Sequence, residues 1–235
     1  MRGQNSPHTG NPRRMSELPL AILISGASIR DGETSVLTDL FEVGLQRLHL
    51  RKPDSNASEV SAILSKIPEA YHNRIVLHRY FDLLKEFSLG GYHYFSGEEP
   101  KDVNGTQSRS LHKLDELKNI GGGLDYCFFG PVYESISKKG YVPKVSLPEL
   151  GGVLYNFKKG KSKKPLVYAL GGVRRRKVPE LFNLGFDGVT LLGSIWGKKD
   201  PVAAFERYQF IERSVWAKKE KEKGFIQRLL AKDET

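Results

Sequence analysis

The sequence predicts one α/β domain in which eight parallel strands close into a (β/α)8 TIM barrel. The length of 235 residues suits this fold, because such barrels commonly run to about 250 residues. Short apolar runs also alternate along the chain with segments of helical spacing, which favours a parallel sheet with right-handed crossovers. An open doubly wound sheet is the rival architecture, but no glycine-rich dinucleotide loop follows the first strand.

The expected strands are short runs rich in Val, Ile, Leu and aromatic residues, as is typical of parallel strands that are covered on both faces. They are expected at 20–24, 47–51, 74–78, 91–94, 107–110, 125–129, 166–170 and 188–192. Eight such runs match the strand number of the barrel.

Segments with a 3.6-residue apolar rhythm separate the strands. In the first of them, Val36, Leu37, Leu40 and Phe41 fall on one helical face. The helices are expected within 36–45, 60–67, 81–87, 111–117, 147–157, 178–184 and 201–211.

The two ends of the chain fall outside this repeat. Residues 1–17 are expected to be a disordered leader, 18–213 the barrel, and 214–235 a charged helical extension. No apolar run reaches the roughly 18 residues of a membrane span, so no membrane association is expected. Cys127 is the only cysteine, so a reducing compartment, the cytoplasm, is the expected location.

The formal net charge is +10, concentrated in tracts at 158–164, 174–177 and 218–223. These tracts carry no interleaved aromatic residues for base stacking and no nucleic-acid motif accompanies them, so nucleic-acid binding is not expected. Small phosphorylated ligands suit the positive charge better. The sequence leaves the oligomeric state open.

Polar residues gather where the first strands of the series end, and barrel enzymes place their sites at those ends. The set comprises His49, Arg51, Lys52, His78, Arg79, His93, Ser96, Glu98, Ser108, Ser110 and His112. An inward-facing Arg51 would need a carboxylate or a ligand phosphate as its partner. His49 and His78 are expected to point into the barrel mouth, either as hydrogen-bonded core residues or as acid–base groups.

The last three strands end in a different chemistry. Gly172 follows the seventh strand, and Gly193 and Ser194 follow the eighth, where a phosphate can approach backbone N–H groups. The sixth strand runs into a polar loop that holds Ser135, Ser137 and Lys138, which suits a phosphate or a pyrophosphate.

Seven stretches in order resemble the thiamine phosphate synthase family and its sister thiazole tautomerases. They are LHLRK at 48–52, FDLL at 81–84, HYFSGEEP at 93–100, SRSLH at 108–112, DYCFFGPVYESISKKG at 125–140, ALGGV at 169–173 and GFDGVTLLGSIW at 185–196. The resemblance implies a (β/α)8 transferase that joins hydroxymethylpyrimidine pyrophosphate to thiazole phosphate with Mg²⁺ and releases pyrophosphate.

The resemblance also implies roles for individual residues. The catalytic residues would be Arg51, Ser110 and Lys138, with Ser110 in the pyrimidine site. Glu98 would bind Mg²⁺. The substrate-binding residues, of which the last three would surround the thiazole phosphate, would be His49, His78, Ser135, Ser137, Gly172, Gly193 and Ser194.

Five positions depart from the family pattern, all in the pyrophosphate half. His49 replaces a glutamine, Pro53 a lysine, His78-Arg79 an asparagine–aspartate pair, and Glu98 the second metal aspartate. Pro131 is retained where tautomerases carry their catalytic histidine. A divergent synthase, a thiazole phosphate isomerase and a non-catalytic phosphate-binding protein therefore all stay open.

Overall fold

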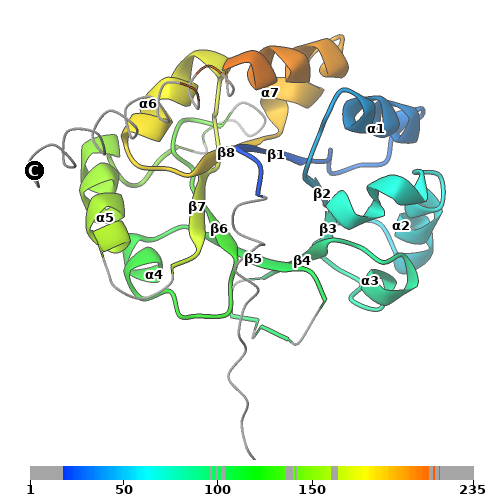
Figure 1. Cartoon of the computed structure of the whole chain (residues 1–235), viewed down its shortest axis with the longest axis horizontal. Coiled ribbons are helices and arrows are strands. Elements are labelled where there is room, and N and C mark those ends of the chain that lie inside the picture. The colour runs from blue at the N-terminus through cyan, green and yellow to red at the C-terminus, as the bar shows by residue number, and fades with distance from the viewer. Residues whose placement is uncertain are drawn as a thin grey trace, which may run out of the picture.

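The computed structural model describes residues 18–95, 97–98, 100–101, 104–135, 140, 142–159, 164–211, 214 and 217. Within them, eight parallel strands form one closed barrel in sequence order, and the helices surround it (Figure 1). The predicted (β/α)8 fold is confirmed. The expected leader at 1–17 and nearly all of the expected extension at 214–235 lie outside the described residues.

The strands are β1 Ala21–Ile24, β2 Leu48–Leu50, β3 Ile75–Leu77, β4 Gly91–Tyr94, β5 Thr106–Leu111, β6 Tyr126–Phe129, β7 Leu166–Ala169 and β8 Gly188–Leu191. Each lies within one residue of its predicted bounds. Pairing of Ala21 with Val189 joins β1 to β8 and closes the barrel. Asp125 and Asp187 precede β6 and β8, and their carboxylates accept hydrogen bonds from the backbone N–H groups of Gln107 and Val167 on the neighbouring strands.

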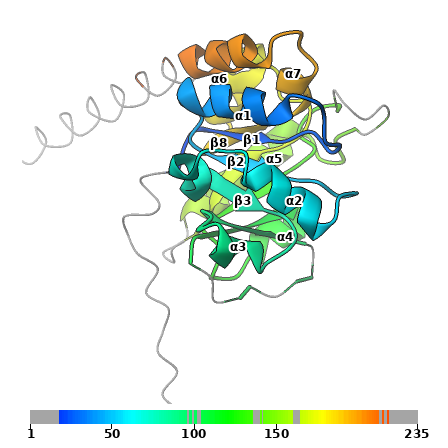
Figure 2. The ribbon, with the colours of Figure 1, turned by 90° about the vertical axis from the view of Figure 1, so that its right-hand side faces the viewer.

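The helices are α1 Glu33–Glu42, α2 Ala57–Leu64, α3 Leu83–Glu86, α4 Leu114–Lys118, α5 Leu147–Lys159, α6 Val178–Asn183, α7 Gly193–Trp196 and a further helix over 201–211. Short 3₁₀ segments at Glu69–Arg74 and Arg175–Lys177, and α7 itself, were not predicted. Figure 2 shows α1, α2 and α3 stacked along one side of the barrel.

Two predicted helices need correction. Leu111 belongs to β5, where it pairs with Phe129, and the following helix starts only at Leu114. The predicted helix over 81–87 is confined to α3, because Tyr80 at φ 61° and Ser88 at φ 50° flank it in the left-handed region. Such residues cannot continue a right-handed helix.

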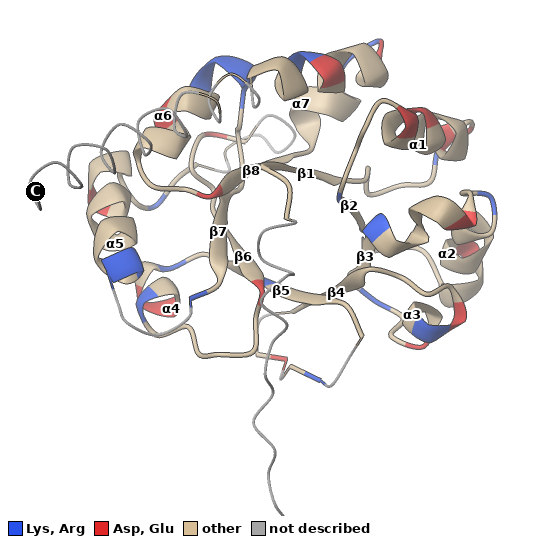
Figure 3. Cartoon of the chain, in the orientation of Figure 1, with Lys and Arg blue, Asp and Glu red and all other residues tan. Residues whose placement is uncertain are grey.

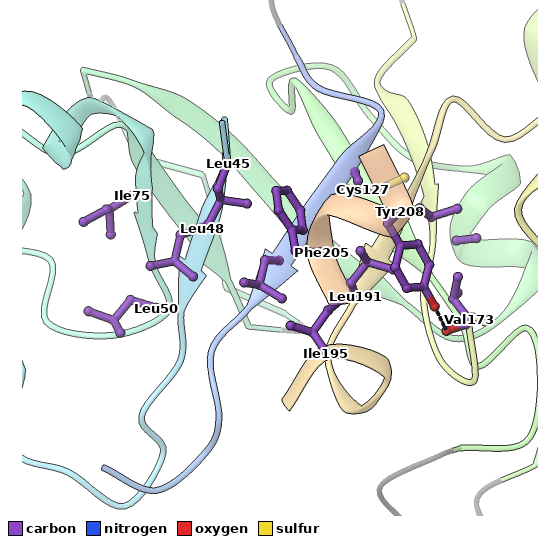
Figure 4. Packing of buried hydrophobic residues seen from close by; sticks show 14 of the residues in the cluster. Leu45, Leu48, Leu50, Ile75, Cys127, Val173, Leu191, Ile195, Phe205 and Tyr208 are labelled. Carbon is purple, nitrogen blue, oxygen red and sulfur yellow. Dashed lines mark hydrogen bonds between the residues drawn. The ribbon is translucent and has the colours of Figure 1, made fainter. Parts of the chain in front are cut away.

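Two packed layers result from the alternation of side chains along each strand. The outer layer, between strands and helices, is apolar: Leu48, Ile75, Leu191 and Phe205 are all buried in it (Figure 4). Cys127 is also buried in this layer, and desolvation raises the pKa of its thiol, as is typical of a cysteine that serves packing.

The inner layer fills the barrel itself, and its side chains are apolar on some strands and polar on others. On β1, β6 and β7 it is apolar or aromatic, with Ile22, Ile24, Tyr126, Phe128 and Tyr168. On β2, β4, β5 and β8 it is polar, with His49, His93, Ser108 and Thr190, all buried.

Charged side chains lie mainly on the helices and loops outside the barrel (Figure 3). Two of the basic tracts are partly neutralised, since Lys158 Nζ lies 2.6 Å from Asp187 and Lys177 Nζ lies 2.9 Å from Glu180. None of the helices described is long and apolar enough to cross a bilayer.

Candidate functional site

A cavity of about 380 Å³ opens at the carboxyl ends of the strands. Every strand contributes to its wall, either with its last residues or with those that follow it. The lining includes Ile24, Arg51, His78, His93, Ser110, Gly130, Leu170, Thr190 and Ser194. This is the end of the barrel where the sequence predicts the site.

The structure brings together most of the predicted site residues. Those that line the cavity are Arg51, His78, Ser110, Ser135, Gly172, Gly193 and Ser194. His49 is fully buried below the cavity and does not line it. Ser137 and Lys138 lie outside the described residues.

At the β7–β8 end, two buried hydroxyl groups line the cavity without a hydrogen-bond partner of good geometry among the described residues. They belong to Thr190 and Ser194. The Ser194 hydroxyl lies beside that of Tyr208, which donates to the carbonyl of Val173 at 3.2 Å. Buried polar groups are normally satisfied, so these two hydroxyls indicate a place for a polar ligand.

Gly172 has a structural reason to be glycine besides any ligand. Its φ is +66°, and a Cβ there would lie 2.3 Å from the Glu134 carbonyl oxygen and 2.6 Å from Tyr133 Cβ. The turn after β7 therefore packs directly on the loop after β6. This contact brings the two loops to one rim of the cavity, where Ser135 also lies.

At the β2–β4 end, a chain of hydrogen bonds runs through the histidines. His49 Nε2 lies 2.6 Å from the Tyr126 hydroxyl, and His49 Nδ1 lies 2.9 Å from His78 Nε2. His93 Nδ1 lies 2.8 Å from Ser108 Oγ, and His93 Nε2 lies 2.9 Å from Ser110 Oγ. The interpretation of His49 as a hydrogen-bonded core residue is therefore the one that the geometry favours.

His93 and Ser108 are two residues of the site for which the sequence predicts no individual role. His93 lies on β4 rather than after it, and both its nitrogens are bonded to serines of β5. The signal was present, because a period of two places His93 and Ser108 on the inward face of their strands.

These three imidazoles are neutral at physiological pH. Desolvation by burial, with smaller effects from neighbouring charges, holds the pKa values of His49 and His78 well below the ordinary value. Burial, followed by the positive charges of Arg51 and Arg109, lowers the pKa of His93 to about 3. Imidazolium forms are thus not available for general acid catalysis.

Arg51 and Lys52 are neighbours with opposite environments. Lys52 Nζ is buried and lies 2.6 Å and 2.7 Å from the two carboxylate oxygens of Glu33, and it donates to the carbonyls of Gly26 and Ser28. No hydrogen bond or ion pair of the Arg51 guanidinium is found within the described residues, and this side chain lines the cavity. The guanidinium is therefore available to an anionic ligand.

A hard cation such as Mg²⁺ finds no matching donor set in the described part of the site. Mg²⁺ prefers carboxylate oxygens, and no Asp or Glu belongs to the cavity lining. The Glu98 carboxylate accepts a hydrogen bond from the Phe95 N–H at 3.1 Å and lies 3.5 Å from Lys101 Nζ. Its assignment as a metal ligand stays a prediction that the geometry does not support.

Comparison with known proteins gives consistent matches. Residues 21–195 match the family model described as thiamine monophosphate synthase. The chain is 26% identical over 191 residues to the thiamine-phosphate synthase of Bacteroides thetaiotaomicron, covering 74% of this chain and 88% of that protein. It is 27% identical over 177 residues to that of Phocaeicola vulgatus, covering 71% and 85%.

A solved structure agrees with these matches. The crystal structure of thiamine phosphate pyrophosphorylase from Bacteroides thetaiotaomicron superposes with a TM-score of 0.68 at 32% sequence identity. The superposition covers 85% of this chain and 98% of that one.

Proposed function

The chain belongs to the thiamine monophosphate synthase family, and on that premise we propose that it joins hydroxymethylpyrimidine pyrophosphate to thiazole phosphate and releases pyrophosphate. It is a transferase of the thiamine phosphate synthase type, and its place is in thiamine biosynthesis. The small phosphorylated substrates expected from the sequence fit this reaction.

The observation that carries the proposal concerns two walls of the cavity. Among the described residues, the Thr190 and Ser194 hydroxyls at one wall have no hydrogen-bond partner of good geometry, and the Arg51 guanidinium at another wall has no ion-pair partner. Thr190 and Ser194 offer donors to the phosphate of the thiazole. Arg51 offers a planar set of donors to the pyrophosphate. A cavity of about 380 Å³ is of the size that small-molecule sites have, roughly 300–1,000 Å³.

The division of labour follows from these positions. Ser194 and Thr190 hold the thiazole by its phosphate, so that its ring nitrogen faces the centre of the cavity. That nitrogen forms the new C–N bond as the C–O bond between the pyrimidine methylene and pyrophosphate breaks. Arg51 stabilises the negative charge that develops on the leaving pyrophosphate.

The remaining predicted residues complete the proposal. Ser110 lines the cavity beside His93 and would contact the pyrimidine. Ser135, with Ser137 and Lys138 outside the described residues, would contribute donors and charge from the loop after β6. Because the described residues do not fit Mg²⁺, we derive no step through a metal.

The single cysteine, buried and without a disulfide, supports a further proposal that the protein works in the cytoplasm.

The test is a mass-spectrometric assay for thiamine phosphate with purified protein and both substrates, with Mg²⁺ added or omitted. Product that depends on both substrates would support the proposal, and reactions that lack either substrate are the controls. Absence of product, with thiazole phosphate still bound by calorimetry, would contradict it and favour an isomerase or a binding protein.

A further inference from the structure

Three histidines converge at the floor of the cavity, and the proposed coupling reaction gives no chemical role to their imidazoles as a group. They are His49 on β2, His78 just after β3 and His93 on β4. One ligand nitrogen from each lies within 4.8 Å of the other two. Among the described residues, no other group of three His, Cys, Asp or Glu side chains is arranged in this way.

We propose that His49, His78 and His93 bind one divalent transition-metal ion of the Zn²⁺ class, with an open coordination position toward the cavity. This site differs in place and in donor chemistry from a carboxylate site for Mg²⁺. It is also independent of the coupling reaction, because the metal can be measured without substrates.

The rings of His49 and His78 face each other through their nitrogens, whereas the rings of His78 and His93 are stacked with an interplanar angle of 29°, so the His93 ring has to turn before its lone pair meets the other two. The ring centroids of His49 and His78 are 5.1 Å apart, whereas His49 Nδ1 and His78 Nε2 are only 2.9 Å apart. The His49–His93 and His78–His93 centroids are 5.2 Å and 4.3 Å apart. Zinc–nitrogen bonds of about 2.0–2.1 Å place two ligand nitrogens about 3.3 Å apart, so small side-chain rotations bring the three nitrogens into range.

The surroundings support ligation from outside the cluster. Metal-binding histidines use their second ring nitrogen to bond an oxygen that fixes the ring. His49 Nε2 has the Tyr126 hydroxyl at 2.6 Å, and His93 Nδ1 has Ser108 Oγ at 2.8 Å. Both oxygens come from β5 and β6, which belong to the rigid barrel wall. The ion would take the other nitrogens, His49 Nδ1 and His93 Nε2, and displace their present hydrogen bonds to His78 Nε2 and Ser110 Oγ.

The donor type selects the class of ion. Neutral imidazole suits Zn²⁺, Ni²⁺, Co²⁺ and Cu²⁺, whereas Mg²⁺ and Ca²⁺ require oxygen ligands.

The open coordination position of the ion faces the cavity, where a ligand can reach it. His78 and His93 line the cavity, as does Arg51, whose charge acts on both rings. The positive charge of Arg51 repels a metal ion bound by these rings, and an anion bound beside Arg51 cancels that repulsion. Pyrophosphate should therefore tighten metal binding, and the metal should tighten pyrophosphate binding by the same factor.

The experiment uses full-length protein without an oligohistidine tag, stripped with a chelator, equilibrated with Zn²⁺ and freed of excess metal by gel filtration. We expect elemental analysis to give one Zn²⁺ per chain. Substitution by Co²⁺ should give the strong visible absorption of a four- or five-coordinate ion. Mg²⁺ at millimolar concentration should displace neither Zn²⁺ nor Co²⁺.

Two variants and a matched control locate the site. His49→Gln and His78→Asn keep a polar side chain but should weaken Zn²⁺ binding at least about 100-fold, since even outer-shell losses cost about 10–100-fold. His112→Asn is the control, because His112 also lines the cavity, with Nδ1 2.6 Å from the Gly130 carbonyl, but lies outside the cluster. It should leave Zn²⁺ affinity within twofold of wild type.

If His49→Gln fails to fold, Tyr126→Phe replaces it, with an expected 10–100-fold loss through the outer-shell hydrogen bond. Three results would overturn the proposal: less than about one-tenth equivalent of Zn²⁺ on the wild-type chain, retention of Zn²⁺ by His78→Asn, or equal losses in His78→Asn and His112→Asn.

Discussion

The two ends of the cavity differ in how far their buried polar groups are satisfied. At the β7–β8 end, the hydroxyls of Thr190 and Ser194 are buried without good partners among the described residues. At the β2–β4 end, both nitrogens of His49 and of His93 have partners within 2.9 Å.

The difference teaches how to separate ligand sites from structural polar groups in one cavity. Burying a polar group without a partner costs free energy, so an unsatisfied group persists where a ligand supplies the partner. A satisfied group contributes to the fold, and a ligand must displace its present bonds. The four substitutions below test this distinction, beginning with the largest expected effect.

Lys52 is a satisfied charge, and its substitution should act on stability alone. Lys52→Met leaves the Glu33 carboxylate buried without its cation, and we expect a loss of about 3–5 kcal/mol in the free energy of unfolding. Denaturant unfolding measures this loss. The turnover of the folded fraction should be unchanged, and the double variant with Glu33→Leu should recover part of the stability.

Arg51, one residue away, has no ion-pair partner among the residues that the structure describes, and its substitution should show the opposite pattern. Arg51→Met should lower kcat/KM for the pyrophosphate substrate about 100-fold, because hydrogen bonds to charged groups contribute about 1.5–3 kcal/mol each. Its unfolding free energy should change by less than about 1 kcal/mol. A stability loss as large as that of Lys52→Met would remove the distinction at this end of the cavity.

Substitution of Ser194 tests the β7–β8 end of the cavity directly. Ser194→Ala should weaken binding of thiazole phosphate about tenfold while leaving binding of the unphosphorylated thiazole alcohol unchanged, since only the phosphate reaches this wall. Calorimetry with both ligands measures the ratio. Equal effects on the two ligands would place the phosphate elsewhere.

Thr190 gives the smallest and most diagnostic effect. Thr190→Val removes a buried hydroxyl that has no hydrogen-bond partner in the described structure, so the unliganded protein should gain up to about 1 kcal/mol of stability. The same variant should bind thiazole phosphate more weakly. A loss of stability in the absence of ligand would show that the hydroxyl is satisfied in solution.

Much of the fold was predictable because its signals are local. Runs such as 20–24 and 166–170 are apolar over a strand's length, and helical spacing such as that of Val36, Leu37 and Leu40 is set by residues within two turns. The wrong helix bounds also have a local cause. Tyr80 and Ser88 flank α3 in the left-handed region, a conformation that neither a tyrosine nor a serine predicts.

The candidate site was predictable only as a place. The carboxyl ends of parallel strands meet at one rim, so Arg51, Ser110 and Ser194 had to come near one another once the barrel was recognised. The depth of each side chain was not predictable. His49 lies below the cavity and His78 lines it, because the strand pairing sets His49 level with Val76, two residues before His78.

The sequence by itself determined the order of strands and helices, the end of the barrel that holds the site, and the chemical types available there. Only the tertiary structure decided which of those groups are satisfied. Within the described part of the chain, it paired Lys52 with Glu33 and left the Arg51 guanidinium without a partner. It also joined His49 to Tyr126 from 77 residues away and brought His49, His78 and His93 close together. Hydrogen bonding and burial depend on distances between strands, which residue order along one strand does not contain.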